Sequence, residues 1–159
     1  MSKIYDFVVI GAGITACTFA SSLNKRFSDA SILIVDHGRR IGGRSTTRQS
    51  RRKSNLQYDH GLPSISFNKN TIEDINILIN PIIKSHKLID ITNDILTINE
   101  LGEINQKFSS EKVYRGFPFM INFCEELISQ SVNPKNITFL FQTLIKSTLR
   151  KNGLWELRV

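Results

Sequence analysis

Residues 7–16 read FVVIGAGITA, and this stretch decides the fold. The apolar run IYDFVVI at residues 4–10 is rich in β-branched and aromatic residues, so it predicts a buried strand. Apolar positions after the glycines predict a helix from Ile14 to about Phe27, and SILIVD at residues 31–36 predicts a second buried strand. A strand, a helix and a strand within about thirty residues form a βαβ unit, which predicts an α/β fold with a parallel sheet.

The glycines between the first strand and the helix fit the pattern G-x-G-x-x-A. Gly11 permits a tight turn, Gly13 removes the Cβ that would block a pyrophosphate, and Ala16 allows close packing of helix on strand. The helix N-terminus offers free N–H groups and a positive dipole end to phosphates. The alternative is that the glycines serve only the turn before the helix and bind nothing. The order strand, glycine motif, helix, strand and acid favours dinucleotide binding instead.

An acid ends the second strand. Asp36 stands 23 residues after Gly13, where a carboxylate can accept hydrogen bonds from ribose hydroxyls and would repel a 2′-phosphate. The sequence therefore favours FAD or NAD over NADP as the ligand.

A second glycine turn follows in HGRRIGGRSTTR, residues 37–48. Gly42 and Gly43 let the backbone approach a phosphate, and the guanidinium groups of Arg39 and Arg44 can clamp it. A simple NAD-binding unit does not need this second basic turn.

The string DFVVIGAGITA…ILIVDHGRRIGGRSTTR resembles the N-terminus of the FAD-dependent amine oxidase superfamily. YDHG at 58–61, YRGFPFM at 114–120 and LWEL at 154–157 are similar to the renalase-like branch. The resemblance implies an α/β fold: a Rossmann-like FAD-binding domain with an added β-hairpin or meander, truncated relative to the family. We expect one such domain over residues 1–159, with 62–113 starting an inserted substrate-side segment.

The resemblance also implies roles for site residues. Pyrophosphate contacts are implied for Gly11, Gly13 and Ala16, and a ribose contact for Asp36. Phosphate and ribityl contacts are implied for Arg39, Gly42, Gly43 and Arg44. Thr47 and Arg48 match the family's Thr-Arg pair. The segment that approaches the isoalloxazine ring is matched by Asp59, His60 and Gly61. A backbone contact to adenine is implied for Leu144.

Two departures from the family stand out. Leu62-Pro63 follows the YDHG segment, and Pro63 lacks a backbone donor there. Relatives are also roughly twice this length and continue into a substrate domain. A fragment, a shortened homologue and one half of a split enzyme all fit this difference.

The activity that the resemblance implies is oxidation of a dihydronicotinamide dinucleotide isomer or an amine through FAD, with O₂ as acceptor. No residue stands out as a general base, because His60 and His86 are lone histidines. A non-catalytic nucleotide-binding module is the alternative. Self-association or pairing with a complementing C-terminal half is also open.

Charge is concentrated in one segment. The chain has 21 Lys and Arg against 14 Asp and Glu, and seven of the basic residues lie between Arg39 and Lys53 with no acid among them. Phosphate contacts alone would give nonspecific nucleic-acid binding, and no recognition module accompanies the segment. We therefore expect neither a specific nucleic acid nor a membrane as partner, and Arg51, Arg52 and Lys53 stay without a role.

Other features predict a cytoplasmic protein without a metal site. No apolar run reaches the ~20 residues needed to span a bilayer. Cys17 and Cys124 are too few for a Cys-rich zinc site, and both fall in predicted helices as core residues.

The rest of the chain predicts further elements. Residues 37–57 predict an extended loop, and residues 57–67 a short strand and a turn. An amphipathic helix is expected from Asn70 to about Lys87, kinked or split at Pro81. Hairpins are predicted around Leu101-Gly102 and Asn152-Gly153, a helix from Pro118 and a strand over ITFLF, residues 137–141.

Overall fold

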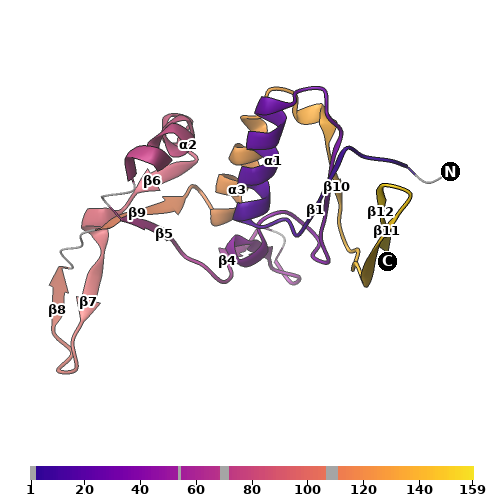
Figure 1. Cartoon of the computed structure of the whole chain (residues 1–159). Helices are drawn as coiled ribbons and strands as arrows, with labels where there is room; N and C mark the ends of the chain where they lie inside the picture. Colours follow the sequence, from indigo (N-terminus) through magenta and orange to yellow (C-terminus); the bar gives the residue numbers. More distant parts are fainter. Residues whose placement is uncertain (1–2, 54, 69–71, 107–110) are drawn as a thin grey trace. The chain divides into compact units, whose positions relative to one another are not determined.

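The computed structural model describes residues 3–53, 55–68, 72–106 and 111–159. The chain divides into two compact units. Unit 1 comprises residues 1–46 and 124–159, and unit 2 comprises residues 47–123. The second unit is therefore inserted between the two parts of the first (Figure 1).

Unit 1 is built on a parallel sheet. Its strands are β1 (Phe7–Ile10), β2 (Ile32–Val35) and β10 (Ile137–Leu140), in the order β1-β2-β10. Phe7 and Ile137 both pair with Ile32 at the start of the central strand. The predicted βαβ unit and its parallel sheet are confirmed.

Two helices lie side by side on one face of this sheet (Figure 1). They are α1 (Ile14–Arg26) and α3 (Met120–Ser129), the latter beginning in unit 2. The core consists of buried side chains from α1, the first glycine turn and the sheet: Ala12, Ala20, Ile32, Ile34 and Ile137. The alternating positions Ile32 and Ile34 face the helices because successive strand residues point to opposite faces.

The last two strands of unit 1 form a hairpin. Strands β11 (Ser147–Lys151) and β12 (Leu154–Arg158) pair antiparallel. Asn152 and Gly153 connect them with φ angles of 51° and 79°, the left-handed values that an Asn-Gly hairpin turn requires. The predicted hairpin is confirmed. A short 3-10 helix, η3 (Pro134–Asn136), leads into β10.

Unit 2 contains a sheet in the order β5-β9-β6, with both neighbours antiparallel to β9. Its strands are β5 (Ile65–Asn68), β6 (Leu88–Asp90) and β9 (Glu111–Gly116). Helix α2 (Ile72–Lys84) precedes β6 and buries Ile79 and Ile82. The 3-10 helix η2 (Thr92–Asp94) follows β6.

Two separate hairpins complete unit 2. One pairs β3 (Thr47–Gln49) with β4 (Gln57–Asp59), and the other pairs β7 (Leu96–Ile98) with β8 (Ile104–Gln106). The second is the hairpin predicted around Leu101-Gly102. The prediction of an extended loop over residues 37–57 was therefore wrong in part. These residues contain β3, the start of β4 and the 3-10 helix η1 (Gly43–Ser45).

Other predictions need correction. Helix α2 runs through Pro81 without splitting, and the N–H of Ser85 still donates to the carbonyl of Pro81. Its predicted first residues, 70 and 71, lie outside the described residues. Strands β6 and β9 were missed. The helix predicted from Pro118 begins at Met120. The substrate-side role expected for residues 62–113 stays a prediction.

Candidate functional site: paired glycine turns of unit 1

The first glycine turn joins β1 to α1. Gly11 has φ of +100°, a value that suits glycine, and its N–H donates to the carbonyl of Val35 at 2.7 Å. Gly13 is the N-cap of α1 and makes no side-chain cap hydrogen bond. A Cβ built on Gly13 would meet no atom within 4 Å, so the helix N-terminus faces open space there.

The Asp36 carboxylate ties the loops of unit 1 together. Oδ2 accepts the N–H of Ala12 at 2.7 Å, and Oδ1 accepts the N–H of Gly38 at 2.5 Å. Sequence reasoning expected a ribose acceptor and missed this positioning of the first glycine turn. A carboxylate has about four lone-pair sites, so acceptor capacity remains for a ribose hydroxyl.

The second glycine turn lies directly on the first. The N–H of Gly42 donates to the carbonyl of Ala12 at 2.8 Å, and Gly13 and Gly42 form a parallel β-bridge. A Cβ on Gly43 would lie 3.1 Å from the Cα of Gly13. Gly42 and Gly43 have φ of 119° and 54°, so both the close approach and the backbone conformation favour glycine.

The other predicted residues of unit 1 are Ala16, Arg39, Arg44 and Leu144. Arg39 and Arg44 are exposed, and Arg44 lies in η1 directly after the second turn. Ala16 is half-buried in the first turn of α1. Leu144 is exposed and follows Thr143, whose N–H donates to the carbonyl of Asp36 at 3.0 Å. Unit 1 thus brings Gly11, Gly13, Asp36, Gly42 and Gly43 into one set of contacts.

The remaining predicted residues lie in unit 2. Thr47 is buried, and its hydroxyl donates to Oδ1 of Asp59 at 2.7 Å. The N–H groups of Met120 and Ile121 donate to Asp59 Oδ1 at 2.9 Å and to Thr47 Oγ1 at 3.3 Å. Arg115 reaches Asp59 Oδ2 at 3.8 Å. Two side chains from the β3–β4 hairpin therefore cap the N-terminus of α3.

This cap was not expected from the sequence. Its partners are 61 and 74 residues apart, and Phe119 before the helix cannot cap with its side chain. That missing local cap is the one signal in the sequence that another segment must supply the acceptors. Arg48 is exposed opposite Tyr58, and His60 and Gly61 are exposed after β4.

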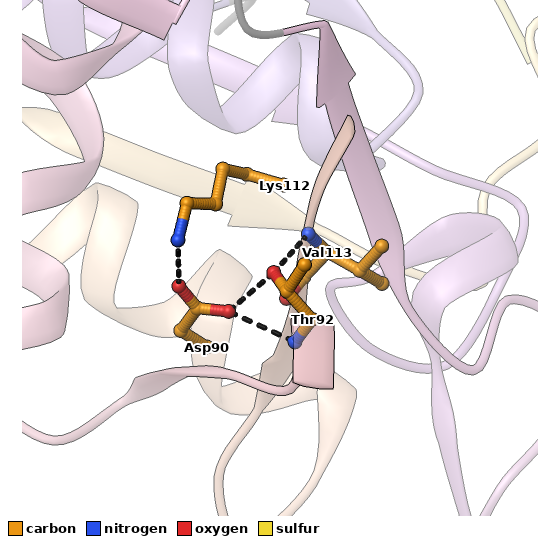
Figure 2. Close-up of polar contacts among 4 residues, drawn as sticks. All are labelled: Asp90, Thr92, Lys112 and Val113. Atoms are coloured by element: carbon orange, nitrogen blue, oxygen red, sulfur yellow. Dashed lines mark hydrogen bonds and ion pairs between the residues drawn. The ribbon is translucent and has the colours of Figure 1, made fainter. Parts of the chain in front are cut away.

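A second polar cluster in unit 2 ties η2 to β9 (Figure 2). Asp90 accepts from Lys112 Nζ at 3.0 Å and from the N–H of Thr92 at 2.9 Å, while Thr92 Oγ1 accepts the N–H of Val113 at 2.9 Å. Partial burial raises the pKa of Asp90, but hydrogen bonds from Thr92 and Lys112 outweigh it and leave this pKa below its usual value. Every bond named here joins one member of the cluster to another, which indicates a structural role.

The two cysteines meet in the core of unit 1. Cys17 on α1 and Cys124 on α3 are fully buried, and both are free thiols. A hydrogen bond with Cys17, together with burial, raises the pKa of Cys124 far above its usual value. A protonated thiol is a poor nucleophile and a poor metal ligand, so this pair is a packing contact.

Among the described residues, no group of three His, Cys, Asp or Glu side chains could hold a metal ion. Over the same ranges, no helix has the length and apolar character needed to cross a membrane.

Comparison with known families places the glycine turns in a broader group. Residues 9–74 match the model of the NAD(P)-binding Rossmann-like domain. The match spans less than half of the chain and contains both turns and Asp36. No curated protein sequence matches the chain.

Solved structures share the fold at low identity. The structure of tetracycline destructase Tet(51) is 16% identical with a TM-score of 0.58, over 98% of this chain and 35% of that one. A putative protoporphyrinogen oxidase from Exiguobacterium sp. 255-15 is 14% identical with a TM-score of 0.62, over 96% and 55%. OTEMO in complex with FAD and NADP is 17% identical with a TM-score of 0.50, over 99% and 23%.

The predicted fold class is thereby confirmed: unit 1 is a Rossmann-like α/β domain. The chain spans between about a quarter and about half of the length of these structures.

Proposed function

We propose that this chain binds FAD at the paired glycine turns and serves as the cofactor-binding part of an oxidoreductase. The contact between Gly43 and Gly13 supports this proposal, because it brings the second glycine turn, which is followed by Arg44, against the first. A nicotinamide dinucleotide needs only the first turn. OTEMO, one of the similar structures, holds FAD and NADP.

The residues present fit such a cofactor. A Cβ on Gly13 would fill the open space that a pyrophosphate needs, and α1 has no acidic residue in its first turn. The N–H groups of that turn and the Arg44 guanidinium would hold the phosphates. Asp36 would accept from the adenosine ribose while keeping the first turn in place. Its negative charge disfavours a 2′-phosphate.

Bound FAD supplies a hydride acceptor, and the chain's own residues bind and orient it. The resemblance in sequence supports renalase-type chemistry, in which a dihydronicotinamide dinucleotide isomer or an amine is oxidised and O₂ is the final acceptor. The roles of Ala16, Arg39, Thr47, Arg48, His60, Gly61 and Leu144 toward the cofactor belong to this proposal.

FAD binding is tested by titrating the purified chain while following flavin fluorescence and the visible spectrum. Gly13→Ala should weaken FAD binding by about 100-fold, because the added methyl group stands where the phosphates approach a helix N-terminus. The same variant should lose at most about 1 kcal/mol of stability in urea, since its Cβ meets no atom of the chain but alanine is a poorer N-cap than glycine.

Gly102→Ala is the matched control. Its Cβ also meets no atom within 4 Å, but it lies in the β7–β8 turn, so FAD affinity should stay at the wild-type value even though the φ of +79° makes alanine strained there. Arg44→Ala should weaken binding by roughly 10-fold and reduce its dependence on salt. A wild-type chain that binds no FAD, or a Gly13→Ala variant that binds it as tightly, contradicts the proposal.

The reaction needs a separate measurement. Adding a dihydronicotinamide isomer without O₂ should bleach the absorbance of bound flavin, and O₂ should restore it. FAD binding without bleaching by any dihydronicotinamide or amine would instead favour a non-catalytic nucleotide-binding module.

A further inference from the structure

The β7–β8 hairpin of unit 2 exposes an unusual amount of aliphatic surface. Leu96, Ile98, Leu101 and Ile104 are 61%, 71%, 83% and 65% exposed. Ile98 pairs with Ile104, and Leu96 lies two residues before Ile98, so these three share one face of the hairpin. Isolated two-stranded hairpins are marginally stable in water, and such a contiguous apolar face indicates a contact with another surface.

The charged residues of the hairpin and its approach, residues 93–106, are all acidic. They are Asp94, Glu100 and Glu103, and the segment has no Lys, Arg or His. Figure 1 shows the hairpin as a separate two-stranded element beyond β5, β6 and β9 of the same unit. An acidic, aliphatic surface would be repelled by nucleic acid and by anionic lipid, so its complement is basic and apolar.

The same unit carries a surface of the opposite charge. The β3–β4 hairpin exposes Arg48, Arg51, Arg52 and Lys53, and residues 48–58 contain no acid. Outside this hairpin, unit 2 has six basic and seven acidic residues. The hairpin therefore carries a local positive charge on an otherwise slightly acidic unit.

The basic hairpin also has apolar groups and a fixed turn. Leu56 and Tyr58 are 50% and 45% exposed and lie two residues apart on β4 and its approach. Ser50 Oγ accepts the N–H groups of Arg52 and Lys53 at 3.2 Å, and the N–H of Ser50 donates to the carbonyl of Leu56 at 2.8 Å. These bonds hold the cations in one display beside Leu56 and Tyr58.

We propose that the two hairpins bind each other between two copies of this chain. The acidic, aliphatic β7–β8 hairpin of one copy contacts the basic, apolar β3–β4 hairpin of the other, and the reciprocal contact closes a dimer. Opposite charges set the orientation, and burial of the leucine and isoleucine side chains supplies the stabilisation. The proposal is independent of FAD binding.

Charge reversal with mixing tests the pairing. Arg51→Glu/Arg52→Glu makes both hairpins acidic, and Asp94→Lys/Glu100→Lys makes both basic. Each variant alone should dimerise at least about 10-fold more weakly than the wild type in sedimentation equilibrium. An equimolar mixture should restore dimers, because each hairpin again meets its opposite charge.

Controls carry the same change in net charge elsewhere. Lys84→Glu/Lys135→Glu and Asp29→Lys/Glu73→Lys replace exposed residues outside both hairpins and should leave dimerisation unchanged. Leu101→Ser should weaken it without changing charge, which tests the apolar part. Far-UV circular dichroism checks that each variant is folded.

Three results would overturn the proposal. They are a wild-type chain that remains monomeric at high micromolar concentration, single variants that dimerise like the wild type, and a mixture that fails to recover dimers. Binding of the wild type to phosphatidylserine vesicles or to single-stranded RNA through Arg51 and Arg52, without dimers, would assign the basic hairpin to that ligand instead.

Discussion

The N-termini of α1 and α3 meet the same requirement in opposite ways. Each begins a helix whose first N–H groups have no partner within the helix. At α3, Asp59 and Thr47 accept the N–H groups of Met120 and Ile121. At α1, the N-cap is Gly13, which makes no side-chain cap and leaves open space.

This difference is what the proposed cofactor site at α1 requires. A carboxylate of the chain already occupies the positive end of α3, so an external anion gains nothing there. No side chain caps the α1 terminus, and the Asp36 carboxylate accepts the N–H groups of Ala12 and Gly38 instead. The positive end of α1 is thus available to a phosphate.

The strongest way to break this contrast is to give α1 the cap that α3 has. Gly13→Asp should abolish FAD binding, with an affinity loss of more than about 100-fold, because a carboxylate would occupy the phosphate position. Folding should be unaffected or stabilised by a few tenths of a kcal/mol, since Asp is a good N-cap and Gly13 has extended backbone angles.

The two quantities are measured by FAD titration and by urea unfolding. Gly13→Asn caps without adding charge and should also block binding. A Gly13→Asp chain that still binds FAD would show that the α1 terminus is not the phosphate site.

Removing the cap of α3 should have the next largest effect. Asp59→Ala leaves the N–H of Met120 and the Arg115 guanidinium without their carboxylate, which should lower the free energy of unfolding by about 2 kcal/mol. Urea denaturation followed by circular dichroism measures the loss. Asp59→Asn keeps an acceptor and should lose less than Asp59→Ala, whereas equal losses would mean that the charge carries the whole effect.

Thr47 offers a finer test of the same cap. Thr47→Val removes the hydroxyl that bonds Asp59 and Ile121 while keeping the buried shape, and should cost about 1 kcal/mol. Thr47→Ser keeps the hydroxyl and serves as the control. If Thr47→Val unfolds at the wild-type urea concentration, the hydroxyl does not contribute to the cap.

The smallest effect is expected at the exposed carboxylate of Figure 2. The pKa of Asp90 is lower in the folded chain than its ordinary value of 3.8, so its contribution to stability is present above that value and is lost as pH falls through the folded pKa. The side chain is 39% exposed, so solvent screening limits this to at most about 0.5 kcal/mol. Asp90→Asn should flatten the pH dependence of stability between pH 5 and pH 3 by roughly that amount, and a larger change would contradict the assignment.

The βαβ unit, the first glycine turn and the terminal hairpin were predictable because their signals are local. An apolar run, a G-x-G-x-x-A string and an Asn-Gly pair each specify a backbone within a few residues. The contact of Gly43 with Gly13 could not be read from spacing, although both glycines were named. The glycine motifs predict the two turns, but they do not predict the contact between them.

Long-range structure in unit 2 was predicted least well. Strand β9 lies at the centre of its sheet but follows residues without a clear strand boundary, and its partners β5 and β6 are far away in sequence. The cap of α3 depends on acceptors more than sixty residues away. At Pro81 a local signal was misleading. Proline is unfavourable inside a helix, but α2 is continuous there and buries the neighbouring Ile79 and Ile82.

The buried cysteine pair allows local opening of the core of unit 1 to be measured by thiol labelling. Cys17 and Cys124 are its only cysteines, and both are inaccessible in the packed helices of unit 1. A thiol reagent can react only when α1 and α3 separate, so the labelling rate measures how often that part of the core opens. FAD that binds at the α1 terminus should slow this labelling, with no engineered probe in the chain.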